Sequence, residues 1–444
     1  MNAFSCKLFE FNDKNAIIFK EVKKMIKHVK QARKNLFERL ETNSVALLYS
    51  GIAPHKTTDQ NYLYTPQRNF FYFTNISKPN MILMFLKGEQ ETKEYLFIEK
   101  NTDHIIKWEG ARMEKEEASR LSGIEESNIL YLENFENIFN MAMNYARSPM
   151  GLPPKTLYLD LYHTSPKVKP IALEQASWII ENYKELKIKA INEHTAYLRM
   201  FKSEEEITEI KKAINHTKKG LEAILKNIKH RTHEYQLFAD FMHAITFDGS
   251  EGYAFDTIAA SGKNAAVLHY IDNNDTLDKE DMILFDLGAL HQNYASDISR
   301  TYPISGEYSD RQKEIYSIVL KVNKEAIEYV KPGITWKALN DFARNRLIEE
   351  TKKIGLIKED KEIYNYYYHS IGHFMGLDVH DVGYYHEPIQ EGMVLTIEPG
   401  LYIKEEGIGV RIEDDILVTK DGNINLSQDI IKEVDDIEAF IKKQ

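Results

Sequence analysis

Four carboxylates stand beside strongly apolar runs in the second half of the sequence. They are Asp286 in MILFDLGAL, Asp297 in NYASDISRTYP, Glu398 in VLTIEPGLY and Glu413 in GVRIEDDILV. Any one of them alone is most simply a turn or strand-end residue. A buried carboxylate, however, costs several kcal/mol unless it is paired or binds a metal. Four such positions in one chain therefore predict a metal site.

The stretch HSIGHFMGLDVHD, residues 369–381, adds three histidines. If His373 joins the four carboxylates, the site holds four negative charges and one imidazole, which two divalent cations would balance. Such oxygen-rich ligation suits Mn²⁺, Co²⁺ or Fe²⁺, with Zn²⁺ as a further alternative, and leaves the identity of the metal open. Two ions can share a water, lower its pKa and polarise a carbonyl, which is the chemistry of metal-assisted amide hydrolysis. Gly372, between His369 and His373, favours strand-like backbone over helix here.

Other catalytic chemistries lack a matching pattern in this sequence. There is no G-x-S-x-G, and the single cysteine, Cys6, stands in the amino-terminal tail without a catalytic motif around it. ASGKNA departs from a P-loop at Asn264, and GIGVRI departs from the dinucleotide fingerprint at Ile412. HSIGH is not H-E-x-x-H. Serine, thiol and nucleotide-dependent chemistry and a helical zinc protease are therefore disfavoured.

The composition limits the class of protein further. With 444 residues, 43% of them hydrophobic, the chain can bury one large core and more readily two. A formal net charge of −11 disfavours a nucleic acid or an anionic membrane as partner. One cysteine permits no intrachain disulfide, and no apolar run approaches the roughly 18 residues that cross a bilayer. We expect a cytoplasmic protein.

The elements that must position these residues fall into two parts. The first opens with an amphipathic helix over 21–40 and continues with short β-rich runs, SVALLYS, FFYFTNI, NMILMFL and EYLFIEK. This pattern predicts an α/β domain over residues 1–195.

The second part, residues 196–444, opens with a capping box formed by Ser203 and Glu206. Helical periodicity covers 204–229, 233–247, 310–331 and 335–355, and strand-like sequence covers 253–303 and 366–418. Two helices thus precede strands twice, which suggests two ααβ halves with helices covering one face of a sheet. The predicted fold class is α+β.

Taken together, the motifs resemble those of the Xaa-Pro aminopeptidases (aminopeptidase P) of the creatinase/prolidase/methionine-aminopeptidase superfamily. FDLGA, ASDISRTYP, HSIGHFMGLDVHD, LTIEPGLY and GIGVRIEDDI occur in the family's order and approximate spacing, and TPQRNFFYFTNI is similar to a segment of its amino-terminal domain. The resemblance implies a creatinase-like α/β domain followed by a pseudo-twofold pita-bread metallopeptidase domain. It also implies a hydrolase that releases the N-terminal residue from peptides with proline at the second position.

The same resemblance implies a dinuclear centre, with Asp297 and Glu413 bridging both ions. Its five ligands would be Asp286, Asp297, His373, Glu398 and Glu413. A metal-bridging hydroxide would attack the scissile carbonyl, and Glu398 would carry the proton to the prolyl nitrogen. His269 and His380 would bind the carbonyl oxygen and stabilise the tetrahedral intermediate.

Further site residues follow from the resemblance within the second domain. His369 would lie near the leaving residue. Arg411 stands two positions before Glu413, so on a strand both face one side, where Arg411 would orient carboxylates or substrate. Tyr253 and Tyr402 would donate hydrogen bonds that tune Asp297.

The first domain would contribute to substrate binding and to oligomer contacts. Asp59 would bind the free amino terminus of the substrate, and Trp108 would lie near the proline pocket, in some family members supplied by a neighbouring subunit. The resemblance favours a homodimer or homotetramer. Alternatively, Trp108 is a structural residue packed within its own domain.

Two other functions remain open on the sequence. A prolidase, restricted to Xaa-Pro dipeptides, would use the same five ligands. An inactive superfamily member that acts as a binding protein is less favoured, because all five ligand positions are filled.

Overall fold

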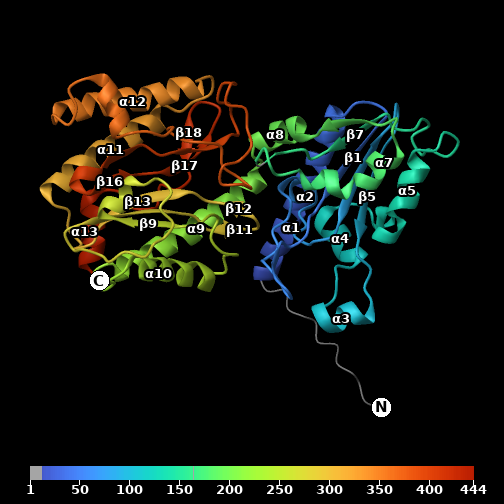
Figure 1. The fold of residues 1–444 in the computed structure, drawn as a ribbon, viewed down its shortest axis with the longest axis horizontal. Coiled ribbons are helices and arrows are strands. Elements are labelled where there is room, and N and C mark those ends of the chain that lie inside the picture. Colours follow the sequence, from blue (N-terminus) through green and yellow to red (C-terminus); the bar gives the residue numbers. More distant parts are fainter. Residues whose placement is uncertain (1–12, 164) are drawn as a thin grey trace, which may run out of the picture. The chain divides into compact units, whose positions relative to one another are not determined.

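The computed structural model describes residues 13–163 and 165–444, so that Cys6 lies outside the described residues. The chain divides into two compact units, Met1–Leu198 and Arg199–Gln444 (Figure 1). The division falls within a helix, α8 (Asn192–Met200). Among the described residues, no helix is both long and apolar enough to cross a bilayer.

The first unit is built on a six-stranded mixed sheet. Its spatial order is β6 (Ile129–Tyr131), β5 (Thr92–Ile98), β4 (Ile82–Lys87), β1 (Ser44–Tyr49), β7 (Thr156–Leu159) and β8 (Lys187–Ala190). β1 pairs antiparallel with β4 and parallel with β7, and it places Leu47 opposite Met84 on one side and Leu159 on the other. Every residue of β1 and β7 is buried, as expected for central strands covered on both faces.

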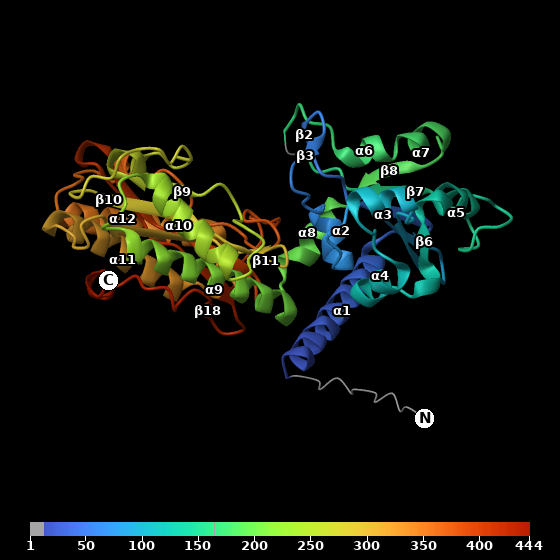
Figure 2. The same cartoon turned by 90° about the horizontal axis from the view of Figure 1, so that it is seen from below.

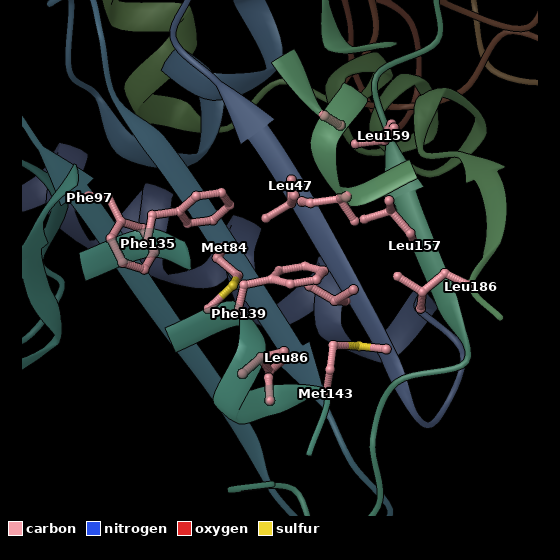
Figure 3. Close-up of a cluster of buried hydrophobic side chains, with 14 of the residues drawn as sticks. Leu47, Met84, Leu86, Phe97, Phe135, Phe139, Met143, Leu157, Leu159 and Leu186 are labelled. Carbon is pink, nitrogen blue, oxygen red and sulfur yellow. The ribbon is translucent and has the colours of Figure 1, made fainter. Parts of the chain in front are cut away.

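The core of this unit lies between the sheet and α5 (Phe135–Ala142). Figure 3 shows Leu47, Met84, Phe97 and Leu157 from the strands together with Phe139 of the helix. Two short helices, α6 (Ile171–Gln175) and α7 (Ser177–Asn182), add buried residues to the same cluster. Removal of this apolar surface from water is the main stabilisation of the unit.

Other helices of the first unit pack together through α1 (Asp13–Arg39), which contacts both α2 (Arg68–Thr74) and α4 (Lys115–Ser122). Two features project with exposed residues: the hairpin of β2 (His55–Thr57) and β3 (Gln60–Asn61), and α3 (Asp103–Glu109), which buries none of its residues.

The β-strand predicted for FFYFTNI is wrong, because this run forms most of α2. Asn69 to Thr74 are all buried, and the helix ends at Asn75 in a left-handed conformation with φ of 56°. A short apolar run that is buried on all sides has no polar face to reveal its period, so a strand and a helix look alike in sequence.

The second unit contains the same set of elements twice. The first half comprises α9 (Glu204–Asn227), α10 (Glu234–Phe247), a sheet of β9 (Ile258–Ser261), β10 (Met282–Leu287) and β13 (Ile298–Pro303), and a hairpin of β11 (Leu290–His291) and β12 (Tyr294–Ala295). The helices α9 and α10 pack against each other (Figure 2).

The second half follows the same plan. It comprises α11 (Asp310–Tyr329), α12 (Trp336–Lys353), a sheet of β14 (Val394–Ile397), β17 (Asp414–Val418) and β18 (Asn423–Asn425), and a hairpin of β15 (Gly400–Ile403) and β16 (Ile408–Arg411). The chain ends in α13 (Val434–Lys442). The predicted α+β class with an N-terminal α/β domain and a pita-bread domain is confirmed. β16 joins the halves by packing against β10 and β13.

One strand prediction in this unit is wrong over 366–393. Apart from isolated bridges at Phe374 and Pro388, this stretch has no strand, and the first strand after α12 begins at Val394. The reason is visible at Gly372, where a Cβ would lie 2.0 Å from the Thr396 carbonyl oxygen. The glycines allow an irregular chain to lie directly on β14 instead of pairing as another strand.

Candidate metal centre

Three predicted ligands converge from three separate segments. Asp297 lies between β12 and β13, Glu413 lies between β16 and β17, and His373 lies in the irregular stretch before β14. All three are buried, and one ligand atom from each lies within 4.8 Å of the others. His373 Nε2 is 3.3 Å from Asp297 Oδ2.

The remaining two predicted ligands border this group. Glu398 directly follows β14, and its Oε1 is 3.8 Å from His373 Nε2. Asp286 on β10 is tied to the group through Arg411, whose Nη2 donates to Asp286 Oδ2 at 2.6 Å. All five predicted ligand positions thus belong to one connected cluster.

Ser299, which no sequence motif indicated, joins two sides of the cluster. Its hydroxyl donates to Glu413 Oε2 at 2.7 Å and accepts from Arg411 Nε at 2.8 Å. Ser299 stands two residues after Asp297. Because alternate residues of a strand face the same side, this spacing could have indicated that Ser299 lies near the ligands. Asp415 was also missed, and its Oδ2 accepts the Asp297 backbone N–H at 3.2 Å.

The carboxylates of the centre repel one another in a dry environment. Burial, followed by repulsion from Glu413 and Asp286, raises the pKa of Asp297 well above its usual range. Burial and then Glu413 raise the pKa of Glu398 in the same direction, and burial and then Asp286 raise the pKa of Glu413 to about 7. The protein itself therefore supplies too little positive charge for these groups.

The cluster fits divalent cations. Asp286 Oδ1 and Asp297 Oδ1 are buried and have no hydrogen-bond partner among the described residues. His373 Nδ1 donates to the Phe374 carbonyl oxygen at 3.0 Å, which leaves Nε2, 3.3 Å from Asp297 Oδ2, as the ring nitrogen that can bind a metal. Orphaned carboxylate oxygens and an imidazole lone pair that share one space form a donor set for metal ions.

A chain of hydrogen bonds runs from Asp286 through Arg411 to His369. Arg411 Nη1 donates to the Tyr402 hydroxyl at 2.9 Å, and that hydroxyl lies 2.8 Å from His369 Nε2. His369 Nδ1 donates to the Ser370 carbonyl oxygen at 2.8 Å, which leaves Nε2 to accept from Tyr402. Burial and then Arg411 lower the pKa of His369 to about 3, so its ring is neutral.

These hydrogen bonds give Tyr402 a different role from the one expected. Its hydroxyl donates to His369 and not to Asp297, because the Arg411 guanidinium occupies its other side. Tyr253 likewise gives no hydrogen bond to Asp297 within the described part of the chain. Its side chain is 41% exposed, and its ring packs against Phe238 at 6.3 Å between centroids.

Two further predicted histidines adjoin the cluster. The His380 ring stacks on that of His373 with 3.9 Å between centroids. Burial, followed by repulsion from His373, lowers the pKa of His380 to about 4, and His269 is close enough to act on it in the same direction. His269 itself is exposed.

Asp59 and Trp108 belong to the first unit. Asp59 lies in the turn between β2 and β3, where its Oδ1 accepts from the Thr57 hydroxyl at 3.4 Å. Trp108, on α3, is 78% exposed, so it is not packed in the interior of its own unit.

The two family models that match the chain cover both units. The model of metallopeptidase family M24 matches residues 208–420, and the model of the aminopeptidase P N-terminal domain matches residues 29–150. The first match contains all five predicted ligands.

Individual relatives show the same similarity. The chain is 32% identical to a Xaa-Pro aminopeptidase of Haemophilus influenzae over 93% of this chain and 96% of that protein. It is 37% identical to a Xaa-Pro dipeptidase of Pyrococcus horikoshii over 68% of this chain and 84% of that protein. A solved structure of a proposed aminopeptidase P from Bacillus anthracis matches with a TM-score of 0.90 and 45% identity, covering 94% of this chain and 98% of that one.

Proposed function

Since the chain belongs to metallopeptidase family M24 and is a metal-dependent aminopeptidase of the aminopeptidase P type, we propose how its own residues remove an N-terminal residue that precedes proline. The convergence of Asp297, His373 and Glu413 carries the proposal. Around them, buried carboxylate oxygens lack partners among the described residues, which suits a hydrolase that binds divalent cations.

The metal ligands are assigned as predicted from the sequence: Asp286, Asp297, His373, Glu398 and Glu413 would hold two divalent ions. Mn²⁺ is the proposed ion, because four of the five ligands are carboxylates. When bound, the ions would make a nucleophilic water available at neutral pH and polarise the scissile carbonyl.

Glu398 is the proposed proton carrier. Its Oε2 lies 3.7 Å from His369 and its Oε1 lies 3.8 Å from His373, so it borders both the ligand group and the Tyr402–His369 side of the site. It would accept a proton from the attacking water and deliver it to the prolyl nitrogen, which must be protonated before it can leave.

His380 and His269 are the proposed donors to the carbonyl oxygen of the substrate. A neutral His380 has one N–H, and stacking on His373 holds its ring beside the ligand group. A neutral donor that is already oriented can stabilise the oxyanion without prior reorganisation. Arg411 would hold Asp286 in place, and Tyr402 would hold the ring of His369.

A second candidate function is a Xaa-Pro dipeptidase, favoured by the similarity to the dipeptidase of Pyrococcus horikoshii. Parallel assays of Xaa-Pro, Xaa-Pro-Xaa and Xaa-Ala-Xaa peptides separate the two functions. The aminopeptidase proposal expects cleavage of the tripeptide with proline and little cleavage with alanine. Cleavage of the dipeptide alone would contradict it.

The assays are best run on metal-free protein supplied in turn with Mn²⁺, Co²⁺ and Zn²⁺. Mn²⁺ should restore the highest rate. A Glu398→Gln variant should remain folded and lose about 10²–10⁴-fold in kcat, the range typical of general acid–base groups. Wild-type kcat in this variant would remove Glu398 from the proton path.

Asp59 and Trp108 are proposed to bind the substrate amino terminus and the proline side, respectively. Both side chains are exposed and therefore accessible to a ligand. A homodimer or homotetramer in the cytoplasm is proposed as the working state, and light scattering of purified protein tests the assembly. Asp59→Ala should raise KM for peptides with a free amino terminus by a larger factor than it lowers kcat.

A further inference from the structure

A single buried carboxylate organises a long segment beside the metal centre. Glu234, at the first position of α10, is fully buried and accepts five hydrogen bonds, all from residues 261–275. To Oε1 the donors are the Ser261 N–H and hydroxyl, both at 2.7 Å, and the Asn264 amide at 3.2 Å; to Oε2 they are the Tyr270 hydroxyl at 2.8 Å and the Asp275 N–H at 3.0 Å.

This arrangement contains no cation that pairs with Glu234 among the described residues. Uncharged donors alone hold Glu234, and they satisfy both of its carboxyl oxygens. The Glu234 backbone N–H also donates to the Asp275 carbonyl oxygen at 3.1 Å. Both ends of the segment are thus fixed to one turn of α10.

The segment presents His269 between two inward-facing neighbours. Leu268 and Tyr270 pack against a buried cluster that includes Ile258 and Tyr402, whereas His269 is exposed. Burial, with the bond to Glu234, raises the pKa of Tyr270 to about 12, so its hydroxyl remains a donor at working pH. Tyr270, the residue next to His269, is therefore bound through its side chain to Glu234.

Two other contacts complete the support of the segment. The Tyr368 hydroxyl donates to the Ala266 carbonyl oxygen at 2.6 Å. The Asn273 amide donates to the Thr257 carbonyl oxygen and accepts the Ala259 N–H, both at 2.7 Å. Val267 and Ile271 are 50% and 53% exposed, so the order of the segment rests on these hydrogen bonds together with the packing of Leu268 and Tyr270.

We propose that Glu234 is a positioning residue for His269, acting through the Tyr270 hydroxyl. The proposal rests on the proposed function only for what His269 does, namely donation to the carbonyl oxygen. An exposed histidine gains orientation from its anchored neighbour, and a misplacement of about 1 Å at a reacting group can cost on the order of 10²-fold in rate. The positioning of His269 can also be tested by a measurement that does not depend on activity.

The first test compares Tyr270→Phe with Tyr316→Phe. Each change deletes one hydroxyl donor with a 2.8 Å bond in the same unit, but Tyr316 donates to the Lys432 carbonyl oxygen outside the site. Tyr270→Phe should lower kcat about tenfold with a smaller change in KM, as expected for lost orientation. Tyr316→Phe should keep kcat within about twofold, since surrounding packing is unchanged. Equal effects of the two variants on kcat would overturn the proposal.

The second test is a double-mutant cycle with His269→Ala. If Tyr270 acts through His269, then Tyr270→Phe should have no further effect on kcat once His269 is absent. Multiplicative losses would show an independent effect and would overturn the proposal. Glu234→Gln should behave like Tyr270→Phe, with an added loss of stability from the donors that then face an amide N–H.

A third measurement separates this proposal from the proposed function. Wild-type kcat in His269→Ala would end the catalytic role of His269 but would leave its positioning open. The imidazole NMR signals of the metal-free protein then decide, with His269 assigned among the 15 histidines by its absence in His269→Ala. The His269 signal should shift or broaden in Tyr270→Phe and stay in place in Tyr316→Phe. An unchanged signal in both variants would overturn the proposal.

Discussion

Glu413 and Asp414 are adjacent, buried carboxylates with opposite surroundings. Glu413 faces other carboxylates, and burial followed by repulsion from Asp286 raises its pKa to about 7. Asp414 accepts from Arg300 Nη2 at 2.9 Å and from Lys432 Nζ at 2.6 Å. Burial alone would raise the pKa of Asp414, but these two cations hold it far below its usual range.

The strand geometry produces this difference. Successive residues of a strand point to opposite faces, so Ser299 bonds Glu413 while its neighbour Arg300 bonds Asp414. One side is an open cluster, consisting of Asp286, Asp297, Glu398 and Glu413, in which negative charge exceeds the charge that the protein supplies. The other is a closed cluster, consisting of Arg300, Asp414 and Lys432. The charges of the closed cluster compensate one another, so its role is structural. The open cluster has uncompensated negative charge, which suits the binding of cations.

The largest expected effect comes from Asp297→Asn in the open cluster. The variant keeps the shape of the side chain but removes one charge, so metal binding should fail and kcat should fall by about 10³-fold or more, as for other essential catalytic groups. Metal content and kcat measure this. The metal-free variant should unfold at the same or a higher urea concentration than metal-free wild type, because repulsion is relieved. Retained metal and activity would show that Asp297 is not a ligand.

Asp414→Asn should have the opposite effects: it should lower stability and leave metal binding intact. It removes one partner of a buried ion pair, which costs about 3–5 kcal/mol of unfolding free energy. Urea unfolding at pH 7 checks this value. The folded fraction should still bind divalent metal, because Asp414 faces away from the open cluster. Unchanged stability would mean that the closed cluster is not structural.

Removal of the metal by a chelator should have an effect of intermediate size on stability, and it separates the two clusters. A ligand that binds only the folded state adds about 2.7 kcal/mol at a free concentration of 100 times Kd. Addition of EDTA to metal-loaded protein should therefore lower the midpoint of thermal unfolding in wild type and in Asp414→Asn. It should leave Asp297→Asn unchanged. An equal shift in all three proteins would place the stabilising ion elsewhere.

Much of the fold could be predicted from the sequence because periodicity is strong where one face is exposed. The helices over 204–229 and 310–331 show a clear stripe, and the capping box at Ser203 is present in the structure. The run FFYFTNI failed because burial on all sides removes the period. The stretch 366–393 failed because its course depends on contact with β14, such as the close approach of Gly372 to Thr396.

The residues that converge in the candidate site could be predicted from the sequence, but the residues that support them could not. Carboxylates beside apolar runs are visible in sequence, since burial of charge is rare. Ser299 and Glu234 are ordinary residue types whose roles arise from contacts with Arg411 and Tyr270, respectively, far apart in the chain. Asp381 gave no catalytic signal, and in the structure it is a buried partner of Arg199 and Lys202.

Asp381 provides the smallest and most specific test, through pH. Burial alone would raise its pKa, but Arg199 and Lys202 lower it below the ordinary value of 3.8. A carboxylate whose pKa is lower in the folded state stabilises the protein above the unfolded pKa, and this stabilisation is lost as pH falls through the folded pKa.

The free energy of unfolding should therefore be higher for wild type than for Asp381→Asn at pH 7, by a margin that stays constant down to about pH 4. Below that, the margin should narrow by up to about 1.4 kcal/mol per pH unit for this single carboxylate. Urea titrations of both proteins between pH 7 and pH 3, with metal absent, measure the margin. A margin that widens in acid would mean that Asp381 is destabilised by its surroundings, like the open cluster, and that its contacts with Arg199 and Lys202 do not compensate for burial.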